Sequence, residues 1–106
     1  MTALVADTFG ALADPTRLAI LERLGAGTAS VSQLAAPHDM SLRGVLKHIA
    51  VLEDAGLVRT TKRGRVRECE LDRRRIDQAA AFIERLQTRW ESRLDRLENY
   101  LETKKS

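Results

Sequence analysis

The stretch MSLRGVLKHIAVLEDAGLVR, residues 40–59, predicts a helix that is followed by a strand. Ser41 suits a helix N-cap, and Gly56 suits the position just beyond the last turn, where a left-handed backbone ends many helices. The apolar residues between them recur every three or four positions, which is the period of a helix with a buried face. They are Leu42, Val45, Leu46, Ile49, Val51 and Leu52. We therefore expect a helix over residues 41–55.

A second helix is expected in ADPTRLAILERLGAG, residues 13–27. Asp14 suits the N-cap, Pro15 suits the first helical position because its fixed φ is already helical, and Gly25 suits the end. The inward face of this helix is expected to consist of Leu18, Ile20, Leu21 and Leu24. The two helices then flank a shorter segment that must connect them.

That connecting segment, SVSQLAAP, predicts a short helix of about two turns. Ser30 and Gln33 have the spacing of a capping box, in which each side chain accepts a hydrogen bond from the other residue's backbone. Only a few residues, around 38–40, separate this helix from the one at 41–55. Two helices joined by such a short link are typical of a helix-turn-helix.

After the helix at 41–55 and Gly56, the sequence LVRTTKRGRVRECEL has a hydrophobic period of two. It predicts two strands, at 57–62 and 66–71, joined by a turn that contains Gly64. Cys69 is expected on the inward face as a small core residue. It is the only cysteine, so the chain has no internal disulfide and no thiolate metal cluster.

From residue 73 the pattern is helical to the end of the chain. The apolar residues step by three or four: Ile76, Ala79, Ile83, Leu86, Trp90, Leu94, Leu97 and Leu101. A helix this long has too little domain left to pack against along its whole face. We therefore expect its apolar stripe to be covered by a second copy of the same helix.

The bulk properties indicate one domain spanning residues 1–106, mostly α with a small β-hairpin. No apolar run approaches the roughly 20 residues that span a bilayer, and the N-terminus has no secretory pattern, so we expect a cytoplasmic protein without membrane contact. There is no nucleophile with a matching base, no carboxylate cluster and no phosphate-cradling glycine loop. We therefore expect no enzyme activity and no cofactor.

The positive charge is concentrated in the middle of the chain. Residues 41–75 contain ten Lys and Arg against five Asp and Glu, whereas residues 1–40 contain two against four and residues 76–106 six against six. A local basic surface of this kind suits a polyanion such as DNA, although a solvated basic face explains the charge equally well.

The stretches ALADPTRLAILERL, MSLRGVLKHIAVLEDAGLV and WESRLDRLENYLE resemble the ArsR family of bacterial transcriptional repressors. The resemblance covers nearly the whole chain in the same order. It implies a winged helix-turn-helix with a long C-terminal dimerisation helix, and a homodimer built from residues 1–13 and 73–103. The interface residues would be Leu4, Phe9, Ile83, Leu86, Trp90, Leu94, Leu97 and Leu101.

The resemblance also implies how such a dimer meets DNA. The helix at 41–55 would lie in the major groove, and the wing at 57–71 would lie on the flanking phosphate backbone or minor groove. Two-fold symmetry would make the operator an inverted repeat. The protein would then regulate its own or an adjacent operon, and whether a small-molecule effector acts on it stays open.

Many family members sense metals through Cys residues in the helix before the recognition helix, or through His and carboxylates in the last helix. Here the short helix SVSQLAA has no Cys and the last helix has no His. His38 and His48 are the only histidines, and they are expected on the turn and the recognition helix. The resemblance is therefore to a branch that does not sense metals, and we expect no metal site.

The recognition helix matches the family pattern at Ser41, Lys47 and His48 and departs from it at other positions. Arg43, Gly44, Leu46 and Ala50 stand where Pro, Ala, Ser and a basic residue are usual. Candidate DNA-binding residues are Ser41, Leu42, Arg43, Leu46, Lys47 and His48 in the helix, and Lys62, Arg63, Arg65 and Arg67 in the wing. The wing cations are expected to neutralise phosphates and to make the affinity fall with salt.

Each of these side chains has alternative roles. Arg43 can pair with guanine or merely touch phosphate or solvent. Lys47 is expected on phosphate rather than on a base, and His48 in helix packing or on phosphate rather than in a pH or ligand switch. Leu46 can contact a thymine methyl group or belong to the core.

Gly44 weakens the helix by up to about 1 kcal/mol relative to alanine. Its use would be to let a DNA backbone or a neighbouring helix come close. The alternative function is a dimeric protein-interaction module that retains the fold without specific operator binding.

Overall fold

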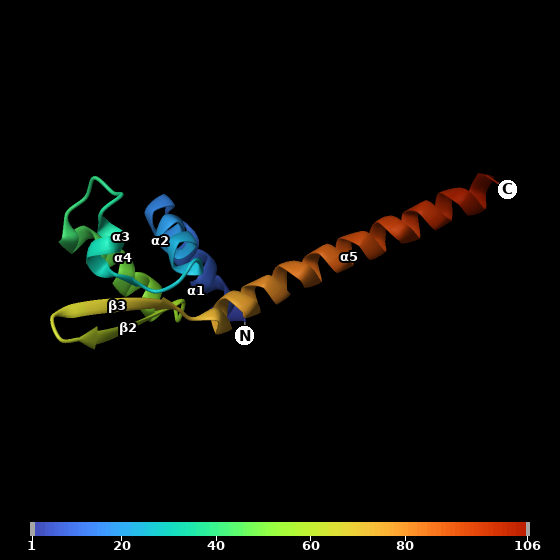
Figure 1. The fold of residues 1–106 in the computed structure, drawn as a ribbon. Coiled ribbons are helices and arrows are strands. Elements are labelled where there is room, and N and C mark those ends of the chain that lie inside the picture. The colour runs from blue at the N-terminus through green and yellow to red at the C-terminus, as the bar shows by residue number, and fades with distance from the viewer. Residues whose placement is uncertain (1, 106) are drawn as a thin grey trace.

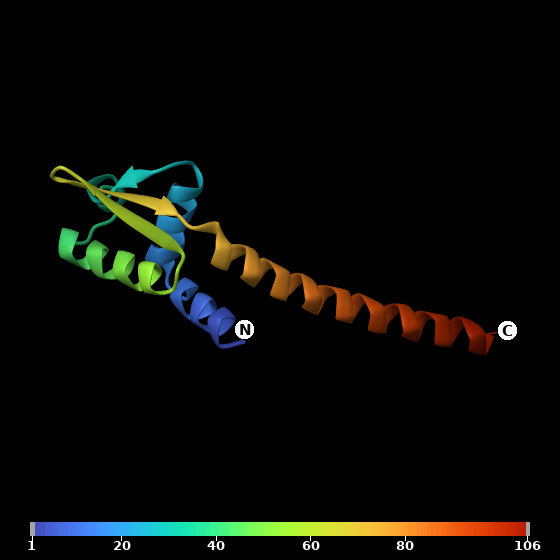
Figure 2. The ribbon, with the colours of Figure 1, turned by 90° about the horizontal axis from the view of Figure 1, so that it is seen from below.

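The computed structural model describes residues 2–105, and in it a winged helical domain continues into one long helix that projects away from the domain (Figure 1). The elements are α1 (Thr2–Leu12), α2 (Pro15–Gly25), β1 (Ala29–Ser30), α3 (Val31–Ala35), α4 (Leu42–Asp54), β2 (Val58–Arg63), β3 (Val66–Leu71) and α5 (Arg73–Lys105). The tip of the β2–β3 hairpin and the free end of α5 lie at opposite ends of the molecule in both views (Figures 1 and 2). The order and type of the expected helices and of the hairpin are confirmed.

The helices start where the sequence places their caps. The Asp14 carboxylate accepts hydrogen bonds from two backbone N–H groups in the first turn of α2, at 2.9 and 3.1 Å. Ser30 and Gln33 form the full capping box at the start of α3. The Ser41 hydroxyl oxygen accepts from the Gly44 N–H at 3.1 Å at the start of α4. Each side chain satisfies backbone donors that have no partner inside the helix.

The sheet has three strands rather than the two of a simple hairpin. β3 lies in the middle, with β2 on one side and β1 on the other, and all pairings are antiparallel. In β1, Ala29 pairs with Cys69 and Ser30 with Glu68. This strand was not expected, because two residues are too few to display a period of two and one of them is also the cap of α3.

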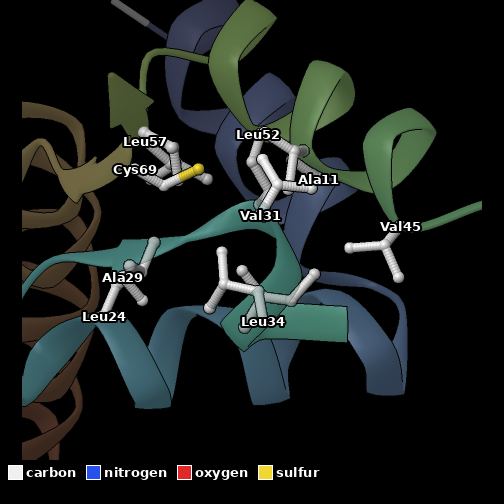
Figure 3. Close-up of a cluster of buried hydrophobic side chains, with 12 residues drawn as sticks. Ala11, Leu24, Ala29, Val31, Leu34, Val45, Leu52, Leu57 and Cys69 are labelled. Atoms are coloured by element: carbon white, nitrogen blue, oxygen red, sulfur yellow. The ribbon is translucent and has the colours of Figure 1, made fainter. Parts of the chain in front are cut away.

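The core lies between α2, α3, α4 and the inner side of the sheet (Figure 3). Cys69 is buried within it, as expected. Leu18 was expected on the inward face of α2 but is 46% exposed. The reason is its angle, because two helical positions separate it from the buried Ile20 and place it about 200° around the helix. Figure 3 shows Leu34 of α3 and Val45 and Leu52 of α4 among the labelled side chains of this core.

Gly56 ends α4 in a left-handed conformation, with φ of 76°. The Leu57 N–H bonds to the Leu52 carbonyl and the Gly56 N–H to the Glu53 carbonyl, which closes the last turn. A Cβ at Gly56 would lie 2.9 Å from Cγ of Arg75 on α5. Gly56 therefore serves both the backbone turn and the close approach of α5.

Replacing Gly56 with alanine is expected to lower the free energy of unfolding by about 2–3 kcal/mol, from left-handed strain and from the collision with Arg75. Gly64 is the matched control, because its φ is 64° but a Cβ there meets nothing within 4 Å. Gly64→Ala should cost only the strain, about 1–2 kcal/mol. Urea unfolding of both variants measures the difference, and equal losses would show that the Arg75 contact does not matter.

α5 leaves the domain soon after it begins. Its first turns pack on α1, where the rings of Phe9 and Phe82 meet edge to face with centroids 6.1 Å apart. From Ile83 to Lys104 every residue is exposed. The helix of 33 residues gives the molecule its longest dimension of 73 Å. None of the helices within residues 2–105 is both long and apolar enough to cross a membrane.

Candidate nucleic-acid interface

The outward side of α4 carries two cations. Val45, Ile49 and Leu52 of this helix are buried, and the opposite side presents Arg43 and Lys47, which are both exposed. These two are four residues apart and therefore lie one turn from each other on the same face. Within residues 2–105 neither forms an ion pair with an acidic side chain. Their charges are thus available to an anion outside the chain.

Two leucines lie beside this cationic face. Leu42 is 51% exposed, and Leu46 is partly buried and packs against the core cluster. They are also one turn apart, on the side of α4 that faces the wing. Both line an open hollow of about 580 Å³ between α4, the hairpin and the start of α3. Both were expected from the sequence to bind DNA. Their position beside the wing follows from the tertiary fold.

Ser41 and His48 turn their polar atoms toward the protein. Ser41 is exposed, but its oxygen accepts the capping hydrogen bond from Gly44. The His48 side chain is only 21% exposed, and its Nδ1 lies 3.3 Å from Arg17 Nη1 and 3.8 Å from Asp14 Oδ2. His48 therefore lies at the junction of α4 with α2.

Arg17 connects that junction to α1. Its Nε donates to the Ala11 carbonyl at 2.5 Å and its Nη2 to the Gly10 carbonyl at 3.4 Å, both at the end of α1. The Arg17 backbone N–H, with help from the charge of His48, lowers the pKa of the neighbouring Asp14 carboxyl, against the opposing effect of desolvation. No local pattern in the sequence indicates this cluster, because its members lie on three different helices.

Gly44 also has an intramolecular explanation. A Cβ at this position would lie 2.9 Å from Cγ of Met40 and 3.3 Å from its sulfur. The missing side chain therefore leaves room for Met40 to fold over the first turn of α4. The space expected for a DNA backbone or a neighbouring helix is occupied by the chain itself.

The wing separates its cations between two faces. Cys69 is buried, so its partner Thr60 and the pair Lys62 and Arg67 lie on the same, inner face, since alternate residues share a face. Lys62 and Arg67 are directly opposite each other. Like charges in this position repel, which favours an anion that lies against both.

The outer face of the wing is largely neutralised. Arg63 Nε lies 3.7 Å from a carboxylate oxygen of Glu68, and Arg59 Nη2 lies 3.3 Å from Glu70. By contrast, no acid of the described chain pairs with Lys62 or Arg67, or with Arg65 in the turn. Of the four wing cations expected to bind DNA, Lys62, Arg65 and Arg67 line the hollow beside α4, and Arg63 does not.

At the base of the wing, Arg74 has an acidic partner. The Asp72 carboxylate accepts from the Arg74 side chain at 2.9 Å and from its backbone N–H at 3.1 Å. These hydrogen bonds lower the pKa of Asp72 to about 2, so the carboxylate stays charged and compensates Arg74. The hairpin tip and the exposed side of α4 thus keep unpaired cations, whereas Arg74 has a carboxylate partner.

Glu53 fixes the wing against the recognition helix. One of its carboxylate oxygens accepts from the Thr60 hydroxyl at 2.6 Å and from the Thr60 backbone N–H at 3.2 Å. This double contact joins the last turn of α4 to β2. Sequence reasoning did not identify either residue, because an acid near the end of a helix is usually a solvated side chain.

The residues available for a metal ion do not fit the metal-sensing pattern described above. α3 contains no Cys and α5 contains no His. Within residues 2–105 there is no group of three or more His, Cys, Asp or Glu side chains placed to hold a metal ion.

The expected dimer residues are found mainly on α5. Leu4 is exposed on α1, whereas Phe9 is partly buried against Phe82. The remaining six are exposed large apolar side chains on α5, with Trp90 at 59%: Ile83, Leu86, Trp90, Leu94, Leu97 and Leu101. Tyr100, which the sequence analysis did not include, is exposed next to them.

Comparison with known proteins gives a consistent result. Residues 12–61 match the family model of a helix-turn-helix domain. The chain is similar to the crystal structure of an ArsR family transcriptional regulator, with 46% identity over 87% of this chain and 95% of the other and a TM-score of 0.82. It is also similar to an ArsR-like transcriptional regulator from Rhodococcus sp. RHA1, with 33% identity, 92% of each chain covered and a TM-score of 0.78.

A third similar structure comes from Mycobacterium bovis and is described as a homodimeric winged helix-turn-helix DNA-binding domain. The identity is 25%, the match covers 88% of this chain and 83% of the other, and the TM-score is 0.65. No curated protein sequence matches this chain.

Proposed function

The chain belongs to the ArsR family of helix-turn-helix transcriptional regulators, and from that membership we propose that it is a homodimeric repressor that binds an inverted-repeat operator. The single observation that carries the proposal is the placement of unpaired cations. Arg43 and Lys47 lie on the exposed side of α4, and Lys62, Arg65 and Arg67 line the hollow between α4 and the wing. Two unpaired cations on α4 and three beside the hollow together suit a DNA backbone.

In the proposed complex α4 lies in the major groove and the hairpin lies on the flanking backbone. Arg43, near the N-terminus of α4, pairs with a guanine, and Lys47 contacts a phosphate. The wing cations hold the next stretch of backbone, and Glu53 keeps the wing at the required spacing from α4 through Thr60. Phosphate contacts of this kind set the orientation, and base contacts set the sequence preference.

The dimer is proposed from the exposed stripe of α5. A single helix gains little stability from its own hydrogen bonds, and most helical stability in proteins comes from packing of an apolar face. Beyond Phe82 no residue of α5 has such packing within the described chain. A second copy of α5, with α1 beside it, would bury the stripe, and the relative from Mycobacterium bovis is described as homodimeric.

The proposed biological role follows from the geometry of such a dimer. Two recognition helices related by a two-fold axis read two inverted half-sites, and a protein that occupies them near a promoter obstructs transcription. We propose that the protein acts in the cytoplasm on its own or an adjacent operon and has no enzyme activity. Its relatives among the solved structures are described as regulators.

The proposal predicts specific duplex binding that depends on Arg43. Selection from a random duplex pool at 150 mM salt should recover an inverted repeat that binds about 10³-fold or more tightly than random duplex. Arg43→Ala should weaken binding to the selected site by about tenfold or more per half-site, because a bidentate guanine contact is lost. Fluorescence anisotropy with labelled duplexes measures both ratios.

Arg89→Ala is the matched control, because it removes the same charge from the projecting part of α5. It should leave the specificity ratio unchanged. Equal affinity for selected and random duplexes would overturn the repressor proposal and would favour the second candidate, a dimeric protein-interaction module. The observation that favours that module is the scarcity of polar side chains on α4.

A further inference from the structure

The recognition surface contains large apolar groups in place of polar ones. Leu42 has half of its surface exposed, and Leu46 shows part of its side chain beside it. Both lie next to the cationic face of α4 and both line the hollow between α4 and the wing. Exposed apolar surface of this kind is a feature of binding sites, and burying it on binding is favourable.

Two polar groups among the candidate DNA-binding residues are engaged within the protein. The Ser41 oxygen caps α4, and the His48 imidazole faces Arg17 and Asp14 at the junction with α2. Apart from Asp54 in the last turn, the polar side chains left on the exposed side of α4 are Arg43 and Lys47. Two cations alone give a base-reading surface little power to distinguish the four base pairs through hydrogen bonds.

The chemistry of the major groove identifies a match for the leucines. Each base pair presents hydrogen-bond donors and acceptors there, and the C5-methyl group of thymine is the one apolar group among them. Resting on the proposed function, we propose that Leu42 and Leu46 recognise thymine through this methyl group. Sequence preference then comes from apolar contact as well as from Arg43.

The hollow explains how a thymine reaches the two leucines. Lys62 and Arg67 form one side of the hollow and the leucines form part of the other. A strand whose phosphates lie against the two cations would turn its base edges toward α4. One helical turn, about 5.4 Å, separates the leucines along α4, and base pairs stack about 3.4 Å apart. The leucines would therefore meet methyl groups within two base steps.

Replacing thymine by deoxyuridine tests the methyl group directly, because it removes the methyl group and leaves every hydrogen-bonding group in place. The wild-type full-length protein is used to select a duplex from the random pool, and each thymine of both half-sites is then replaced in symmetric pairs. At the contacted positions binding should weaken about tenfold per pair, which corresponds to one methyl group lost in each half-site. Pairs outside the half-sites should change binding less than twofold.

Leu42→Ala shows whether the leucine senses the methyl group. Leu42 is half exposed, so this variant should unfold at the same temperature as the wild type. Its affinity for the thymine duplex should fall, and its ratio between thymine and uracil duplexes should approach one. Lys47→Ala is the control, because it should weaken both duplexes equally and preserve the ratio.

Each outcome has a defined consequence. A selected site whose affinity is the same with thymine and uracil at every position would overturn the inference and leave the repressor proposal standing. A ratio that survives in Leu42→Ala, and also in Leu46→Ala when that variant melts as the wild type does, would likewise overturn it. Failure to select any site would overturn the proposed function, and with it this inference.

Discussion

Replacing Leu94 and Leu97 on α5 with glutamate is expected to convert the protein from a dimer to a monomer at micromolar concentration. Both side chains lie in the exposed stripe that the proposed dimer buries. Two-fold symmetry doubles each substitution, so four carboxylates would enter one apolar interface. A buried unpaired charge costs several kcal/mol, which exceeds what the remaining contacts can offset.

The affinity for DNA should also decrease when the dimer dissociates. A monomer holds one half-site, and the second contact is no longer intramolecular, so affinity for a complete inverted repeat should drop by at least 100-fold. Sedimentation velocity measures the association state, and anisotropy with the selected duplex measures the affinity. Circular dichroism should also show helix loss, because α5 beyond Phe82 has no other packing within the described chain.

The control places the same residue on the other side of the helix. Ser92 and Asn99 lie roughly opposite the stripe and are exposed, so Ser92→Glu with Asn99→Glu adds the same charge without entering the interface. This variant should remain dimeric and bind DNA. A dimer that persists in the Leu94 and Leu97 variant would contradict the proposed interface.

Replacing Lys62 and Arg67 on the inner face of the wing with alanine is expected to reduce the salt dependence of DNA binding. A dimer then loses four cations that lie against phosphates in the proposed complex. Because each neutralised phosphate contributes about 0.9 to the slope of log affinity against log salt, the slope should become shallower by about 3.6. At 150 mM salt the affinity should fall by at least 100-fold, for specific and random duplexes alike.

Arg59→Ala with Arg63→Ala is the matched control, because it removes two cations from the same hairpin. These residues lie on the outer face and have acidic partners in Glu70 and Glu68. Their loss should change the slope by less than one. Equal effects of the two double variants would show that the wing acts through its net charge alone. Lys62 and Arg67 would then make no specific phosphate contacts.

Much of the architecture could be predicted because its causes are local in the chain. Ser30 and Gln33 contact each other within one turn, and Gly56 ends α4 through bonds to residues at most five positions away. The length of the apolar stripe on α5 could also be predicted, since apolar residues recur every three or four positions as far as Leu101. The residues of the candidate interface were predicted as a set, and their roles within the complex remain proposals.

Other features depend on which residues distant in the chain come together. His48 belongs to the recognition helix by sequence, and its contact with Arg17 exists because α2 packs beside α4. β1 exists because β3 offers it a free edge. The contact of Glu53 with Thr60 likewise requires the hairpin to fold back against α4.

The sequence by itself determined the helices, their caps, the wing turn and the apolar stripe of α5, because neighbouring residues specify each of them. Only the tertiary structure decided that the His48 imidazole is engaged, since it requires α2 to pack beside α4. It also decided that Leu42 and Leu46 share a hollow with the unpaired wing cations. Those contacts join residues that are distant in the chain, 31 positions apart for Arg17 and His48, and no local pattern encodes them.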